Sequence, residues 1–314
     1  MAILVSCEKK ETPITLPAKG DGVAMQVDMG ENYEFQFFIS LQNNTIVHIS
    51  PTKNWDLAFS CDHNSHAIFL NGAKLMSAIN THKSNMADVG IADTSDKADA
   101  WQYDNASGTI DSTVIGDWKK SNDVYIIKLS NSSNKVRKIK FLSEDIFQFK
   151  FEVADLPAAV PTVITLPKRA QYNYTYFSFD FLAEVPDVEP NKQSWDLQVT
   201  TYNYTFYDQN PILPYVVTGV LLNPTGTTAY KDSITPYNSI NADFALAMPL
   251  SNHKDVIGFD WKKYDIDKNL YTVDSRYNYI VKTKSESYYK LRFLDFYSAS
   301  GIKGSPKFEF LQLK

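Results

Sequence analysis

The sequence predicts an all-β protein that consists of two tandem domains of one antiparallel fold with long irregular loops. Three observations support this prediction: a pattern that occurs twice, an aromatic-rich composition and a chain length of 314 residues. The chain has 19 Tyr, 19 Phe and 5 Trp but only 12 Gly, and the aromatic residues fall in alternating runs that suit half-buried strands. The length agrees with two domains of about 150 residues each.

Four short motifs of the first half recur in the same order in the second half. The pairs are Pro13-Ile-Thr-Leu-Pro17 with Val163-Ile-Thr-Leu-Pro167, Asn54-Trp-Asp-Leu57 with Ser194-Trp-Asp-Leu197, Val114-Ile-Gly-Asp-Trp118 with Val256-Ile-Gly-Phe-Asp-Trp261, and Lys138-Ile-Lys-Phe-Leu142 with Lys290-Leu-Arg-Phe-Leu294. This repeat is longer than a solenoid unit of about 20–50 residues. Proline cannot donate to a central ladder, and segment 154–168 carries three prolines. We therefore expect a leader and tether at 1–12 and domains at 13–156 and 162–314.

Alternating apolar and polar residues predict strands at 32–37, 147–153, 277–281 and 289–293. Segment 172–179 places aromatic residues on both faces, which indicates a strand that is covered on both sides or bulged. Segments 80–113 and 225–250 have no strong period, and we expect long loops there, with one short helical piece near 96–103.

Charge and motifs exclude several classes of function. The 31 basic and 36 acidic residues form no Lys/Arg block, so we expect no nucleic-acid partner. Motifs for zinc proteases, serine hydrolases and phosphate-binding loops are absent from the sequence, so an enzyme is not indicated. Segment 265–276 resembles the start of a calcium loop, but Leu270 and Arg276 stand where glycine and a bidentate acid are required.

The N-terminus carries a candidate site of lipid attachment. Leu4-Val-Ser-Cys7 resembles a bacterial lipobox with Cys7 as the acylated residue, although the apolar run before it is shorter than a complete signal-peptide core. Acyl chains on Cys7 would anchor the protein to a membrane, with residues 8–13 as a polar tether. The alternatives are a free Cys7 or a disulfide with Cys61; lipidation would leave Cys61 as a small buried thiol.

Aromatic residues at strand spacing form a second candidate site. Tyr202, Tyr204, Phe206 and Tyr264 could line an apolar pocket for a flat ligand, or they could belong to the core. The five histidines include one close pair, His63 and His66, without the Cys or carboxylate pattern of a zinc site.

A series of motifs in the second half resembles the HmuY family of haem-binding lipoproteins. It comprises Tyr174-Thr-Tyr-Phe-Ser-Phe179, Trp195-Asp-Leu197, Trp261, Tyr279-Ile-Val-Lys-Thr283, Tyr289-Lys-Leu-Arg-Phe-Leu-Asp-Phe-Tyr297, Gly301-Ile-Lys-Gly304 and Phe308-Glu-Phe310. The first half repeats it more weakly, from Trp55-Asp-Leu-Ala-Phe59 to Lys138-Ile-Lys-Phe141. The resemblance implies HmuY-like β domains, an outer-membrane lipid anchor, and capture of haem that is passed to a TonB-dependent outer-membrane transporter.

In that family, the resemblance implies, two His or two Met side chains near the second tryptophan hold the iron. Residues 262–266 after Trp261 include neither His nor Met, so no ligand transfers residue by residue. Since His, Met and Tyr can all ligate haem iron, the remaining candidates are Met248, His253 and Tyr264, or His82 and Met86 in the other copy.

We therefore expect a cell-surface lipoprotein, held in the outer membrane by Cys7, that binds haem or another iron-bearing ligand and makes or breaks no bond. The rival hypothesis is a surface lipoprotein for adhesion or for binding protein or glycan, without a cofactor. The two hypotheses differ in whether loops 80–113 and 225–255 converge on an apolar cleft with an available His, Met or Tyr.

Overall fold

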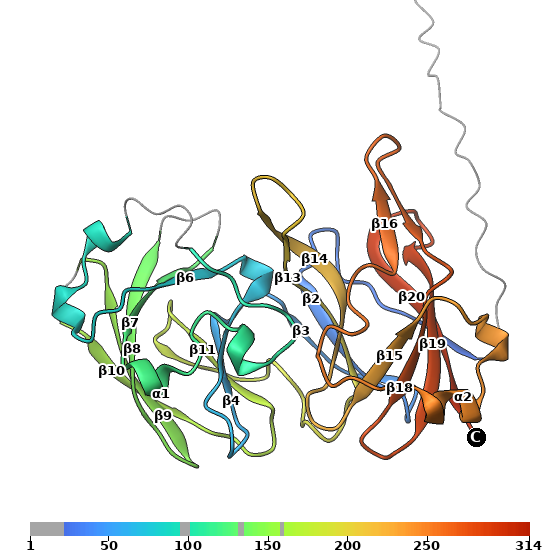
Figure 1. Cartoon of the computed structure of the whole chain (residues 1–314), viewed down its shortest axis with the longest axis horizontal. Coiled ribbons are helices and arrows are strands. Elements are labelled where there is room, and N and C mark those ends of the chain that lie inside the picture. Colours follow the sequence, from blue (N-terminus) through green and yellow to red (C-terminus); the bar gives the residue numbers. More distant parts are fainter. Residues whose placement is uncertain (1–21, 95–100, 131–134, 158–159) are drawn as a thin grey trace, which may run out of the picture.

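The computed structural model describes residues 22–94, 101–130, 135–157 and 160–314. Strands dominate these residues, and the paired strands are antiparallel, which confirms the predicted all-β class. The strands form two bodies that lie side by side along the long axis (Figure 1). Each body consists of a four-stranded and a five-stranded sheet.

The first body contains strands β4 to β12. Its four-stranded sheet has the order β12-β11-β4-β5, and its five-stranded sheet has the order β10-β9-β8-β7-β6. The strands are β4 (Leu57–Ser60), β5 (Ile68–Leu70), β6 (Ser77–Asn80), β7 (Val124–Lys128), β8 (Val136–Glu144), β9 (Gln148–Asp155), β10 (Thr162–Pro167), β11 (Tyr174–Ser178) and β12 (Ala183–Val185).

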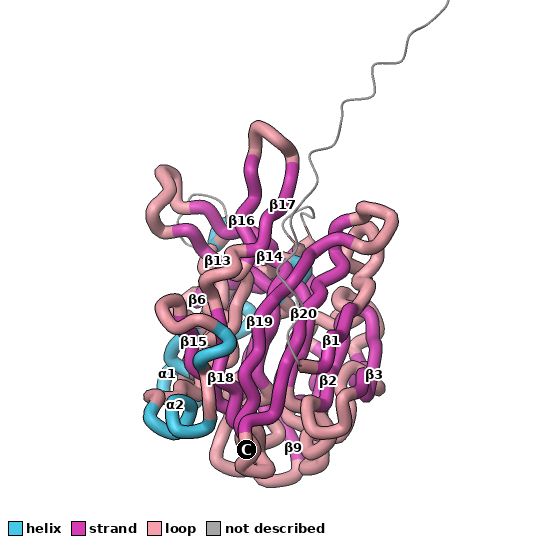
Figure 2. Tube along the Cα trace, turned by 90° about the vertical axis from the view of Figure 1, so that its right-hand side faces the viewer, coloured by secondary structure: helices cyan, strands magenta, loops and turns pink. Residues whose placement is uncertain are grey.

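The second body repeats this arrangement with sheets β14-β13-β2-β3 and β1-β20-β19-β18-β15. The strands are β1 (Val23–Gln26), β2 (Phe35–Ser40), β3 (Thr45–Pro51), β13 (Leu197–Phe206), β14 (Leu213–Leu222), β15 (Thr228–Asp232), β18 (Asn278–Lys282), β19 (Tyr288–Tyr297) and β20 (Lys303–Leu313). Figure 2 shows the five-stranded sheet and, above it, the separate hairpin of β16 (Lys262–Asp265) and β17 (Leu270–Val273).

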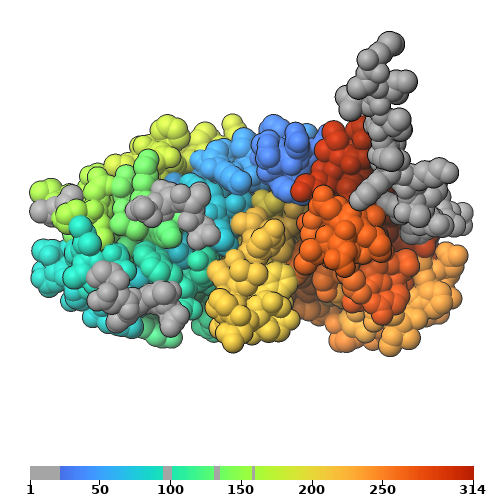
Figure 3. All heavy atoms as spheres, turned by 90° about the horizontal axis from the view of Figure 1, so that it is seen from above, coloured from blue at the N-terminus to red at the C-terminus, as the bar shows by residue number. Residues whose placement is uncertain are grey.

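The two repeats exchange their first three strands. β2 pairs with β13 of the other repeat and β1 pairs with β20, while β11 pairs with β4 and β10 pairs with β9. Figure 3 shows the N-terminal segment, in blue, against the C-terminal strands, in red. The expected boundary between 156 and 162 is therefore not a boundary between compact bodies, because the proline-rich segment there joins two paired strands of the first body.

The repeated motifs build the two cores. In the first body Phe59, beside the Trp-Asp-Leu motif, stacks on Phe151 with ring centroids 5.1 Å apart. In the second body Trp261 stacks on Phe293 at 3.9 Å and is fully buried. Offset-stacked and edge-to-face aromatic pairs add stability beyond their buried area, which accounts for the high aromatic content.

Strand β11 confirms the prediction that both of its faces are covered. Phe177 belongs to the core of the first body. Tyr176, on the opposite face, packs with Ala58 and Val188, and Tyr174 lies against this small cluster. The face of β11 that carries Tyr176 thus points away from the core of the first body, toward the segments that connect the first body to the second body.

Helices are short and lie in the connections between strands. They are α1 (Trp118–Ser121), α2 (Ala242–Ala247) and the 3-10 turns η1 (Gly72–Lys74), η2 (Met86–Asp88), η3 (Ile91–Asp93), η5 (Ile110–Ser112) and η6 (Tyr237–Ser239). Most of the expected helical piece near 96–103 lies outside the described residues, and Gln102 at its end forms a β-bridge with Ala78. Among the described helices, none has the length and apolar character that crossing a bilayer requires.

A buried lysine in each repeat holds a loop in place. Lys138 donates to the carbonyls of Met86 and Val89 at 2.8 and 3.1 Å. Lys290 donates to the carbonyls of Tyr237 and Ile240 at 3.0 and 3.1 Å. These bonds satisfy carbonyls at the ends of the η2 and η6 turns, so the repeated lysines have a structural role.

Candidate functional site

The structure does not bring together the three residues proposed as iron ligands. Met248 ends helix α2 and Tyr264 lies in β16, and these elements are at opposite ends of the second body in both views (Figures 1 and 2). His253 is exposed and follows Ser251, which pairs with Ala229 of β15. The structure therefore does not place Met248, His253 and Tyr264 in one site, because α2 and the β16–β17 hairpin lie at opposite ends of the second body.

The two candidates of the first body differ in exposure. Met86 is 5% exposed and packs with Val124 and Ile126 in a small apolar cluster, whereas His82 is exposed, 3.6 Å from Asp123. Cys7 lies outside the described residues. Cys61 is a free, buried thiol, as expected for a small core residue.

Three of the four aromatic residues predicted to form a pocket do meet. Tyr204 contacts Phe206 with ring centroids 4.9 Å apart, and both contact Phe259, at 4.7 and 5.9 Å. Tyr264 lies elsewhere, against Tyr271 of its own hairpin. The rings of Tyr204, Phe206 and Phe259 line a hollow of about 530 Å³, which we call the aromatic pocket. Its full lining is Tyr202, Tyr204, Phe206, Tyr207, Asp208, Lys231, Asp255, Val256, Gly258, Phe259 and Asp260.

The pocket forms because segment 254–260 runs against β14. Val220 and Gly258 exchange backbone hydrogen bonds at 2.9 and 3.1 Å, and Leu222 donates to the Lys254 carbonyl at 2.7 Å. A Cβ on Gly219 would lie 2.4 Å from the Gly258 carbonyl oxygen, so only glycine permits this approach. This backbone contact places the Phe259 side chain against Tyr204 and Phe206 of β13.

Charged groups give the pocket a polar rim. Lys231 forms an ion pair with Asp260, and its ammonium lies 3.9 Å from the centroid of the Tyr277 ring. Burial raises the pKa of the Asp255 carboxyl and raises the pKa of the Tyr202 phenol well above its usual value. Tyr204 and Tyr207 are the accessible phenols, 38% and 71% exposed.

The chemistry of the pocket suits a flat, largely apolar ligand. Its size is within the range of about 300–1,000 Å³ that is usual for small-molecule sites. Its lining includes no His or Met, and no group of three or more His, Cys, Asp or Glu side chains gathers in the described part of the chain to hold a metal ion. Sequence reasoning missed Phe259 and Tyr207, since Phe259 reaches β13 from a distant segment and Tyr207 falls just past the end of the strand.

Comparison with known proteins gives one match that bears on function. The model of the HmuY family, described as HmuY protein, matches residues 32–136 and 215–310, more than half of the chain. A search of curated proteins finds no match.

Solved structures show weaker likenesses. A protein from Bacteroides vulgatus described as an HmuY-like haem-binding protein is 18% identical over 43% of this chain and 82% of its own, with a TM-score of 0.24. A protein from Bacteroides fragilis described as a lipoprotein is 17% identical over 48% and 76%, with a TM-score of 0.22. Apo PinO from Porphyromonas gingivitis is 10% identical over 94% and 99%, with a TM-score of 0.31.

Proposed function

The chain belongs to the HmuY family, and from this premise we propose that it is a cell-surface lipoprotein that binds haem, or another iron-bearing ligand, and passes it to an outer-membrane transporter. The bound molecule is cargo, held without a covalent step. The observation that carries the proposal is the aromatic pocket of the second body.

The pocket supports haem as the cargo through its shape and its rings. Tyr204, Phe206 and Phe259 form an aromatic cluster in the pocket, and aromatic rings of this kind pack favourably against a flat conjugated ligand. The segment that brings Phe259 to the pocket leads directly into Trp261, the position around which the family resemblance places iron-binding residues. The hollow of about 530 Å³ gives room for a small-molecule ligand.

Tyrosine is the iron ligand that this pocket offers. The pocket lacks the His or Met pair that the resemblance implies, but a tyrosine phenolate is an established axial ligand of haem iron. Tyr207 is the most exposed phenol of the lining, so we assign iron ligation to Tyr207 and stacking to Tyr204.

A hemin titration of the chain from residue 22 onward tests this proposal. We expect a saturable Soret shift near one equivalent, with a tyrosinate-type spectrum that Tyr207→Phe removes. Phe259→Ala should weaken binding without changing the type of axial ligand. Met248→Ala, His253→Ala and Tyr264→Ala are controls outside the pocket and should bind hemin like the unsubstituted chain. A spectrum equal to free hemin plus protein would refute haem binding, and loss of binding only in a control variant would refute this site.

The anchor and the hand-off need their own tests. Metabolic labelling with palmitate should mark the full-length protein and fail in Cys7→Ser, and surface protease should remove the protein from intact cells. Transfer is tested by mixing the haem-loaded chain with a purified TonB-dependent transporter. Transfer no faster than spontaneous release of haem would contradict a hand-off.

A further inference from the structure

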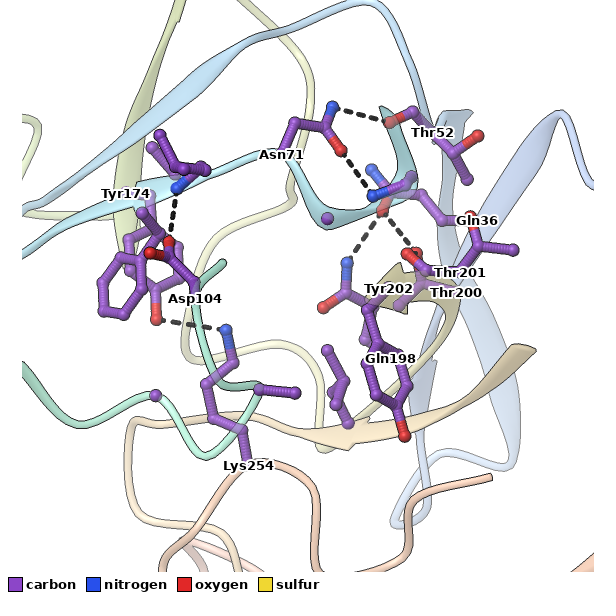
Figure 4. Close-up of a pocket in the computed structure, with 18 of the residues that line it drawn as sticks. Gln36, Thr52, Asn71, Asp104, Tyr174, Gln198, Thr200, Thr201, Tyr202 and Lys254 are labelled. Carbon is purple, nitrogen blue, oxygen red and sulfur yellow. Dashed lines mark hydrogen bonds between the residues drawn. The ribbon is translucent and has the colours of Figure 1, made fainter. Parts of the chain in front are cut away.

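A loop of the first body reaches the aromatic pocket of the second body. Loop 104–108 lies between β6 and β7 of the first body, where the Asp104 carboxyl accepts hydrogen bonds from the Leu70 and Val114 amides at 2.6 and 2.8 Å. A second, smaller hollow of about 90 Å³ lies beside this loop, between the two bodies (Figure 4). The loop contacts the second body at three points, and these points include both segments that form the aromatic pocket.

The first contact is with β13, the strand that carries Tyr202, Tyr204 and Phe206 of the pocket. The buried side-chain amide of Asn203 donates to the Asp104 carbonyl at 2.6 Å. A buried hydrogen bond is costly to break, because each partner is then left without its own partner. The backbone of the loop is therefore tied to this strand.

The second contact is apolar. Ala106 of the loop packs against a buried cluster of the second body, and Phe206 and Phe259 of the pocket pack against the same cluster. The cluster consists of Tyr202, Val217 and Leu221. The first body thus contacts the same apolar residues as two of the rings that line the pocket.

The third contact is with segment 254–260, which forms the other wall of the pocket. The Lys254 amide donates to the Ser107 carbonyl at 2.9 Å. The stem of Lys254 lies against Gly108, where a Cβ would be 2.4 Å from Lys254 Cδ. The segment is therefore joined to the first body at the residue where it begins, through both the backbone and the side chain.

The ammonium of Lys254 extends onto the first body. It lies 5.0 Å from the centroid of the Tyr174 ring and 5.6 Å from that of the Phe69 ring, and it donates to the Tyr174 hydroxyl at 3.4 Å (Figure 4). Burial raises the pKa of the Asp104 and Glu189 carboxyls to about 7, and the charge of Lys254 partly offsets this rise in pKa. Attraction to the rings and to the two carboxyls therefore holds the ammonium in place.

We propose that Lys254 is a positioning residue for the aromatic pocket: it holds segment 254–260 on the first body, so that loop 104–108 keeps Phe259 against the rings of β13. The inference rests on the proposed function, since it concerns the affinity of the same pocket for haem. A ligand binds more weakly when only a fraction of the molecules have an assembled site. Release of the segment should therefore lower the affinity for hemin.

Hemin titration and hydrogen exchange of the chain from residue 22 onward test the proposal. Lys254→Met keeps an apolar stem and removes the charge. Surface segments open locally with small free energies, and loss of a cation–π contact should shift this opening roughly three- to tenfold. The Val220 and Gly258 amides, which join the segment to β14, should exchange faster by about that factor. Hemin binding should weaken at least about twofold, and Lys254→Arg, which keeps a cation, should restore most of it.

Lys284→Met is the matched control. The stem of Lys284 also packs against a glycine, since a Cβ on Gly226 would lie 3.1 Å from Lys284 Cγ, and its ammonium donates to Gln193. The linings of the two hollows do not include Lys284, so the control should leave hemin affinity and amide exchange unchanged. Circular dichroism and urea unfolding verify that each variant is folded.

A double-mutant cycle tests the contact between the bodies. Tyr174→Leu removes one of the two rings under the Lys254 ammonium and should also weaken hemin binding. Because both changes remove the same contact, the double variant should lose less affinity than the product of the two single losses. Single losses that multiply independently would overturn the proposal.

Two further outcomes would overturn it. One is equal hemin affinity and equal amide exchange in Lys254→Met and Lys284→Met. The other is faster exchange in Lys254→Met without any loss of hemin affinity, since Lys254 would then hold the segment without positioning Phe259. Failure of the unsubstituted chain to bind hemin would refute the proposed function instead, and the exchange rates would still decide whether Lys254 holds the segment.

Discussion

Asp56 and Asp196 make equivalent hydrogen bonds in the two bodies, and each bond joins a residue of one repeat to a residue of the other. Asp56 Oδ2 accepts from the Phe179 amide at 2.7 Å, and Asp196 Oδ2 accepts from the Leu41 amide at 2.8 Å. Phe179 and Leu41 directly follow the exchanged strands β11 and β2. The repeated Trp-Asp-Leu motif is therefore the point at which each repeat holds the strand received from the other.

The exchange predicts which fragments of the chain fold. Fragment 53–190 contains all nine strands of the first body, β4 to β12, and should unfold cooperatively by circular dichroism. Fragments 22–156 and 162–314 each contain strands of both bodies and incomplete sheets. Each should be poorly ordered alone, and an equimolar mixture should form a one-to-one complex. Two fully folded monomeric halves that ignore each other in size-exclusion chromatography would contradict the exchanged topology.

The two aspartates should differ in their contribution to stability. Asp56 also forms an ion pair with Lys74 and is 1% exposed, so Asp56→Ala should lower the free energy of unfolding by about 3 kcal/mol. Asp196→Ala leaves the Leu41 amide without its acceptor and should cost about 1–2 kcal/mol. Urea unfolding of the whole chain measures both. Equal losses would show that the Lys74 pair contributes nothing.

The sequence predicted the strands well and their exchange not at all. Alternation along 147–153 and 289–293 indicates which face of a strand is buried, and β9 and β19 lie there. Alternation cannot indicate which of two equivalent partners a strand selects. Strands β4 and β13 both follow the same Trp-Asp pair, so β2 and β11 meet similar partners in either arrangement.

The sequence likewise predicted one of the two hollows and missed the other. The spacing of Tyr202, Tyr204 and Phe206 places them on one face of a strand, and the structure confirms that they share a pocket. A second hollow, which Trp55 and Trp195 both line, escaped prediction because it is enclosed by residues of the two bodies together. Local periodicity carries no signal for such a junction.

Glu189 should make stability depend on pH. Burial raises the pKa of its carboxyl from 4.5 to about 7, so the native state binds this proton more tightly than the unfolded chain does. The stabilisation is complete below the unfolded pKa and is lost as pH rises to about 7, with a slope of up to about 1.4 kcal/mol per pH unit. Glu189→Gln keeps an acceptor for the Tyr174 amide and should remove the contribution of Glu189 to this slope. Urea unfolding between pH 4.5 and 7.5 measures it.

The control for this prediction is Glu31→Gln, which changes an exposed carboxyl in the same way. It should leave the slope of the unsubstituted chain unchanged. Asp104, whose pKa burial also raises to about 7, contributes a slope of the same sign in all three proteins. An identical slope in Glu189→Gln and Glu31→Gln would contradict the assignment to Glu189.

Gly219 should be required for the aromatic pocket, because it lets segment 254–260 reach β14. A Cβ there would lie 2.4 Å from the Gly258 carbonyl oxygen, so Gly219→Ala must move one backbone away from the other. Such overpacking costs about 1–3 kcal/mol, and the Val220 and Gly258 amides should exchange hydrogen faster. The affinity for hemin should also fall in Gly219→Ala. Gly90→Ala is the control, since a Cβ at Gly90 meets no atom within 4 Å. Full protection of both amides in Gly219→Ala would mean that the contact at Gly219 does not position Phe259.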